Sequence, residues 1–135
     1  MVNAAPALAR GRAAAESLMV DTCTIRHRTG ETTDTTTGVV TPTTTTVYTG
    51  RCKVQQSTLG AASEPRDPGE ASVRLVAYAV HLPVATSTGI RDGDEITITA
   101  AGHDPDLVGK VFTVLGTMAK TYATARRLQV QEVAT

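Results

Sequence analysis

The most regular alternation of apolar and polar positions lies between residues 72 and 101. Residues 73–82 are apolar on both faces, which predicts a central strand that is covered on two sides. Pro83 ends this strand, because proline has no N–H to donate to a ladder. Residues 94–100 alternate and predict a second strand, with the inward positions Ile96, Ile98 and Ala100. The intervening residues 91–94 have the composition of a tight turn, so we interpret the whole stretch as the structural spine of the chain.

Four other segments alternate with a period of two and predict strands: residues 21–28, 47–56, 108–116 and 125–133. Their predicted inward positions are Cys23, Ile25, Tyr48, Cys52, Val54, Phe112, Val114, Leu128 and Val130. Polar residues occupy the outward positions, among them Arg51, Lys53, Gln55, Arg127, Gln129 and Gln131. About six short strands joined by turns predict a mainly β fold, a small antiparallel β-barrel that forms one domain over residues 1–135.

An N-terminal arm and helix precede the strands within residues 1–19. Pro6 suits the start of a helix, and residues 7–19 are rich in helix-forming Ala, Leu, Arg and Glu. The apolar stripe of this helix is thin, and Gly11 weakens its middle. We therefore expect the helix to dock on the barrel or on a neighbouring subunit.

Two long polar segments interrupt the strand pattern. Residues 29–46 contain 11 threonines in 18 positions, which predicts an exposed hairpin or loop, because Thr favours strands but offers little to a core. Residues 57–71 lack periodicity and contain Gly60, Pro65, Pro68 and Gly69, which predicts a long loop. Loops of this length in compact domains are usually functional or disordered.

Composition and charge narrow the classes of function. The 135 residues carry 13 Lys and Arg against 13 Asp and Glu, so the charge pattern of a nucleic-acid-binding protein is missing. Cys23 and Cys52 are too few for a disulfide framework or a zinc site, and we expect them to be buried, reduced thiols. The sequence has no apolar run long enough to span a bilayer and no signal peptide, which predicts a soluble protein made in a reducing cytoplasm.

Candidate chemistry is sparse. His27, His81 and His103 are scattered without metal-ligand spacing, so a structural or solvated role is favoured for each. The acidic residues at 92–95 and 104–106 fit the turns that contain them, although their convergence in space would leave an enzyme open as an alternative. We therefore predict no enzymatic activity, no cofactor and no metal site.

Several collinear segments together resemble the head-to-tail connector proteins, also called head closure or stopper proteins, of long-tailed bacteriophages that infect actinobacteria. The segments that carry the resemblance are residues 13–27, 47–55, 76–84, 90–114 and 121–130. None of them is a catalytic signature. The resemblance lies in their order and covers most of the chain outside the two polar segments.

This resemblance implies a structural component of the phage neck, assembled in the host cytoplasm and located in the virion. Subunits of this family form a ring, here expected to be six- or twelve-fold, below the portal-bound adaptor protein and above the tail terminator or tail tube. Genomic DNA passes through the lumen without sequence-specific binding, and no membrane is involved. The long loops of related proteins line the channel or contact neighbours. This assigns a candidate interaction loop to Ser57, Leu59, Glu64, Arg66, Asp67 and Glu70, and a second one to Glu31, Asp34, Val39 and Val40.

Two alternatives remain open at this level. A tail terminator or minor tail protein also uses a small β fold, and the position of the protein in the particle would separate it from a neck component. A nucleic-acid-binding β-barrel is the second alternative. It would bind nucleic acid with a strong dependence on salt.

Overall fold

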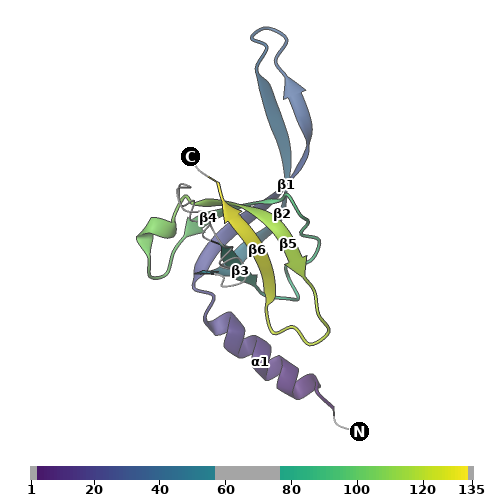
Figure 1. Cartoon of the computed structure of the whole chain (residues 1–135), viewed down its shortest axis with the longest axis vertical. Coiled ribbons are helices and arrows are strands. Elements are labelled where there is room, and N and C mark those ends of the chain that lie inside the picture. Colours follow the sequence, from purple (N-terminus) through teal and green to yellow (C-terminus); the bar gives the residue numbers. More distant parts are fainter. Residues whose placement is uncertain (1–2, 57–76, 134–135) are drawn as a thin grey trace, which may run out of the picture.

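The computed structural model describes residues 3–56 and 77–133. Its elements are α1 (Ala5–Ser17), β1 (Asp21–Thr33), β2 (Val40–Gln56), β3 (Tyr78–Leu82), β4 (Glu95–Ala100), the 3-10 helix η1 (Pro105–Leu107), β5 (Val111–Met118) and β6 (Arg126–Glu132). The strands form one antiparallel sheet that closes into a barrel in the order β1-β2-β3-β6-β5-β4 (Figure 1). The predicted mainly β fold with an N-terminal helix is confirmed.

Alternating side chains of all six strands fill the barrel interior. The buried cluster contains Cys23, Ile25, Tyr48, Cys52, Val80, Leu82, Ile96, Ile98, Phe112, Val114, Leu128 and Val130. Phe112, the one phenylalanine of the chain, contacts Tyr78 edge to face with 5.4 Å between the ring centroids. Such aromatic pairs contribute about 0.5–1.5 kcal/mol beyond the burial of their area. The period-two pattern therefore predicted the core correctly at most of its positions.

One predicted inward residue was wrong. Ala100 is exposed, whereas Ile96 and Ile98 of the same strand are buried. The pairing of β4 with β1 shifts register between Thr22 and Cys23, next to the partner of Ala100. A bulge of this kind re-aims the side chains beyond it, so the alternation ends before the strand does.

The two strands of the predicted spine are not neighbours. β3 lies between β2 and β6, while β4 lies between β1 and β5, so they occupy opposite sides of the barrel. The described part of the central strand begins at Tyr78 rather than Val73, and residues 72–76 lie outside the described residues. The turn at 92–93 is confirmed, with Gly93 at a φ of 88°.

The Thr-rich segment forms a hairpin that projects from the barrel (Figure 1). β1 and β2 continue beyond their predicted ends and pair as far as Thr33 and Val40. In this fully described segment no side chain between residues 28 and 47 is buried. The hairpin forms because Thr has high β propensity and its hydroxyls bond across the strands, as Thr29 Oγ1 does to Thr43 Oγ1 at 3.2 Å.

Helix α1 projects from the other end of the barrel (Figure 1). Every residue of α1 is described and none of them is buried. It is held near the β5–β6 connection, where Arg12 Nε donates to the carbonyl oxygen of Ala123 at 3.1 Å. A Cβ at Gly11 would lie 2.9 Å from the side chain of Thr124, so glycine permits this approach. The expected docking of α1 on the barrel is thus limited to a few contacts, chiefly with the β5–β6 connection at one end of the barrel.

Candidate functional site

A buried carboxylate occupies the turn that leads into β4. Asp94 is 1% exposed, and its Oδ1 accepts a hydrogen bond of 2.6 Å from Nδ1 of His27 on β1. Its Oδ2 accepts from the backbone N–H of Arg91 at 2.9 Å. The Arg91 side chain lies 3.4 Å from Nε2 of the same histidine, through Nη1. The side chains of Arg91, His27 and Asp94 therefore form a chain of polar contacts at the base of the hairpin.

The contacts of this cluster connect strands that are distant in the sequence. The backbone of Asp94 also bonds to β5, through Val114 N at 2.9 Å, so one residue joins β1, the turn and β5. The other acidic group is used in its own turn, because Asp104 Oδ1 accepts from Asp106 N at 3.0 Å and caps η1. Within the described residues, no three His, Cys, Asp or Glu side chains gather as a metal site.

The two cysteines lie on neighbouring strands in the core. Cys23 pairs with Gly50 and Cys52 pairs with Asp21, and both cysteines are free thiols with no exposed surface. The contact with Cys23, together with burial, raises the pKa of the Cys52 thiol. A thiol with a raised pKa and no access to solvent is a poor nucleophile and a poor metal ligand. The prediction that both thiols are buried is confirmed.

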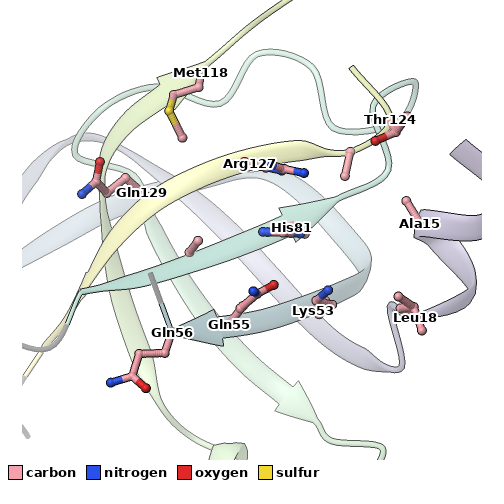
Figure 2. A pocket seen from close by; sticks show the side chains of 12 residues that line it. Ala15, Leu18, Lys53, Gln55, Gln56, His81, Met118, Thr124, Arg127 and Gln129 are labelled. Carbon is pink, nitrogen blue, oxygen red and sulfur yellow. The ribbon is translucent and has the colours of Figure 1, made fainter. Parts of the chain in front are cut away.

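The outer face of β2, β3 and β6 carries a row of three basic side chains. Lys53 is the direct cross-strand partner of His81, and His81 is the direct partner of Arg127. The row forms the floor of a pocket of about 430 Å³. We call this the cationic pocket, and Figure 2 shows its residues on the outside of the barrel beside the last turn of α1.

The rest of the cationic pocket combines amides with apolar groups. Gln55 and Gln129 supply side-chain amides next to the basic row. Leu18 and Met118 form apolar parts of the wall, and Leu18 is 59% exposed. Among the described residues that line the pocket, none is acidic. The pocket can therefore hold an anionic group together with a small apolar surface.

The middle member of the row stays neutral at neutral pH. Burial, together with the neighbouring charges of Lys53 and Arg127, lowers the pKa of His81 from 6.5 to about 4. The row therefore presents the cationic side chains of Lys53 and Arg127 on either side of a neutral imidazole. An anion placed between them would interact with both charges and could accept hydrogen bonds from the floor.

The hairpin carries the second set of candidate interaction residues. Glu31 pairs with Arg28 on the exposed ribbon. Asp34 Oδ1 accepts from the backbone N–H of Thr36 at 2.8 Å and holds the turn. Val39 and Val40 are 57% and 52% exposed. The structure thus brings these four residues together at the outer part of the hairpin, whereas Ser57, Leu59, Glu64, Arg66, Asp67 and Glu70 lie outside the described residues.

Sequence reasoning did not identify the cationic pocket or the His27–Asp94 contact. It placed Lys53 and Arg127 on outward strand positions, but only the order and register of the strands show that His81 lies between them. The partners His27 and Asp94 are 67 residues apart in the chain. The sequence gives only a weak signal for this contact. His27 lies near the end of the predicted strand 21–28 and Asp94 lies at the start of the predicted strand 94–100, and these two strands are neighbours in the structure.

Comparison with known proteins gives a family without an assigned activity. A family model described as a family of unknown function, DUF6093, matches residues 11–131. The chain belongs to the DUF6093 family. No curated protein matches its sequence.

The chain is similar to the solution structure of protein SF1141 from Shigella flexneri 2a. The match has a TM-score of 0.55 and 18% identity over 84% of this chain and 92% of that chain. At this level of identity, the likeness shows that the two share a fold. In the described part of this DUF6093 chain, no helix has the length and apolar character that crossing a membrane requires.

Proposed function

We propose that this DUF6093 protein is a structural component of a phage neck, which assembles into a ring below the portal and its adaptor. In this role it continues or closes the DNA channel and presents a surface to which the tail attaches. The resemblance of its ordered segments to stopper proteins supports the proposal, and so does the shape of the subunit.

The observation that carries the proposal is the pair of projections at opposite ends of the barrel (Figure 1). The closed part of the barrel has no free sheet edge, so copies cannot associate there by adding strands. Contacts between subunits must then use side chains on the barrel surface or elements that leave it. The hairpin and α1 are such elements. No side chain of α1 is buried, and none is buried in the hairpin between residues 28 and 47, so both elements are accessible to another molecule.

The polar outer surface agrees with a conduit. The formal net charge is zero, and the sequence has no excess of basic residues that would hold DNA tightly. Strong neutralisation of phosphates would slow the passage of a genome through the lumen. A neutral subunit is therefore compatible with a ring through which DNA passes.

The location of the protein in purified phage particles tests the proposal. A tagged copy should bring a gold-conjugated binder to the junction of head and tail in electron micrographs. Particles without the protein should have filled heads that lose DNA or fail to join tails. Gold at the tail end next to the tube would identify a tail terminator, gold elsewhere on the tail would identify a minor tail protein, and absence from the particle would refute a virion role.

A further inference from the structure

The lining of the cationic pocket suits a group that is both anionic and partly apolar. On its floor, Lys53 and Arg127 lie on either side of His81, and its wall includes Leu18 and Met118. A DNA duplex is a poor fit, because its backbone is convex and its phosphates offer no apolar surface to the wall of the pocket. A protein segment that carries a carboxylate next to aliphatic side chains fits both parts of the pocket.

The tip of the hairpin has that composition. We define the tip as residues 34–39 together with the flanking Glu31 and Val40. Asp34 and Glu31 are acidic, and Val39 and Val40 are aliphatic and more than half exposed. Two backbone N–H groups donate to Oδ1 of Asp34, which lowers the pKa of this carboxyl and keeps it ionised. The carboxylate lies on the exposed tip, where a cation of another molecule can approach it.

The hairpin tip of a subunit cannot reach the cationic pocket of the same subunit. The hairpin leaves the barrel at the end opposite α1, and the pocket lies beside the last turn of α1 (Figures 1 and 2). The contact is therefore possible only between two copies. It joins two different surfaces, which makes it a head-to-tail contact, and such contacts close into rings when the rotation between subunits allows it.

We propose that the hairpin tip of one subunit docks in the cationic pocket of the next, with Asp34 over the row formed by Lys53, His81 and Arg127. This inference rests on the proposed ring and names the contact that builds it. The carboxylate meets the two cations, and Val39 and Val40 meet the apolar wall. The amides of Gln55 and Gln129 are placed to bond the exposed backbone of the turn.

Disulfide trapping between two variants of the full chain tests this contact. One variant carries Thr35→Cys, beside Asp34 at the exposed tip, and the other carries Gln129→Cys, so the Asp34 carboxylate and the basic row both stay intact. The native Cys23 and Cys52 have no exposed surface and do not compete. The matched control replaces Gln129→Cys by Gln131→Cys, on the same face of β6 but outside the pocket. After mild oxidation of mixed variants, the dimers are quantified on non-reducing gels and the joined peptides are identified by mass spectrometry.

The cross-link to position 129 should exceed the control by about fivefold. Adding Arg127→Glu to the Gln129→Cys variant should lower the yield by about fivefold, because an attractive charge pair becomes repulsive. Equal yields at 129 and 131, or a yield that Arg127→Glu does not change, would overturn the inference. A short DNA duplex that binds the wild type at low salt, and not the Arg127→Glu variant, would assign the pocket to phosphate and also overturn it.

The two proposals fail in different ways. Gold at the neck without a cross-link would leave the neck component standing and remove the hairpin contact. A specific cross-link in a protein absent from the neck would keep the head-to-tail contact and remove the neck assignment.

Discussion

Replacement of Asp94 by alanine should destabilise the protein by about 3 kcal/mol. The carboxylate is 1% exposed and accepts two hydrogen bonds, from His27 Nδ1 at 2.6 Å and from Arg91 N at 2.9 Å. A hydrogen bond to a charged group contributes about 1.5–3 kcal/mol, and His27 regains part of its share from water because its side chain is 29% exposed. A loss of about 3 kcal/mol is a large part of the ~5–15 kcal/mol by which small domains are stable.

Urea unfolding of the full chain measures this loss, and two further variants apportion it. Asp94→Asn keeps an acceptor for the Arg91 N–H and should lose about half as much. His27→Ala removes one of the two bonds and leaves the carboxylate buried, so about 2 kcal/mol is expected. The double variant should be more stable than the sum of the single losses predicts, because the two side chains share one interaction.

A result of the opposite sign would refute this reasoning. Groups that are kept for function often cost stability, so their removal tends to stabilise a protein. If Asp94→Ala were as stable as the wild type, or more stable, the His27–Asp94 pair would be a functional group rather than a link between strands. Enzymatic chemistry at this corner would then have to be reconsidered.

Three other outcomes are expected. The pKa of His81 is lowered to about 4 from 6.5, so the stability that the neutral ring provides is present above pH 6.5 and is lost as pH falls toward 4. The full shift would correspond to about 3 kcal/mol, and solvent screening of the partly exposed ring makes the loss smaller. His81→Gln should remove this slope in urea titrations at several pH values. Gly102→Ala should cost about 1–3 kcal/mol, because its Cβ would lie 2.9 Å from the carbonyl oxygen of Val20, whereas Gly116→Ala, with open space around it, should be neutral. A hairpin shortened by removal of residues 31–42 should unfold within about 0.5 kcal/mol of the wild type, since nothing in it is buried, and a larger change in the thermal midpoint would contradict the description of the hairpin as a projection.

The local structure of the barrel and its class could be predicted from residue patterns, but the order of its strands could not. Alternation identifies a strand and the face that it buries, as it did for Ile96 and Phe112, because the period of a strand is two. Alternation does not say which strand lies next to which. The spine strands β3 and β4 are consecutive in the chain and yet lie on opposite sides of the barrel. Their separation depends on contacts among all six strands at once.

The same limit explains why the cationic pocket was missed. Lys53, His81 and Arg127 belong to three strands that are far apart in the chain, and they form a row only when the register of both ladders is known. A shift of one residue in either ladder would move its basic side chain into the barrel. By contrast, the hairpin residues Asp34 and Val39 are close in sequence, and their exposure follows from composition alone.

The threonine-rich composition of the hairpin can be explained by two physical requirements, strand formation outside the core and resistance to aggregation. A two-stranded ribbon outside a core is marginally stable in water, so it needs residues that favour strands. Aliphatic residues would provide that preference but would make an exposed, self-pairing edge that aggregates. Threonine combines the branched Cβ of a strand former with a hydroxyl that bonds across the ladder, as Thr29 does with Thr43. The ribbon can thus stay ordered outside the core and present an acidic tip, as the proposed docking requires.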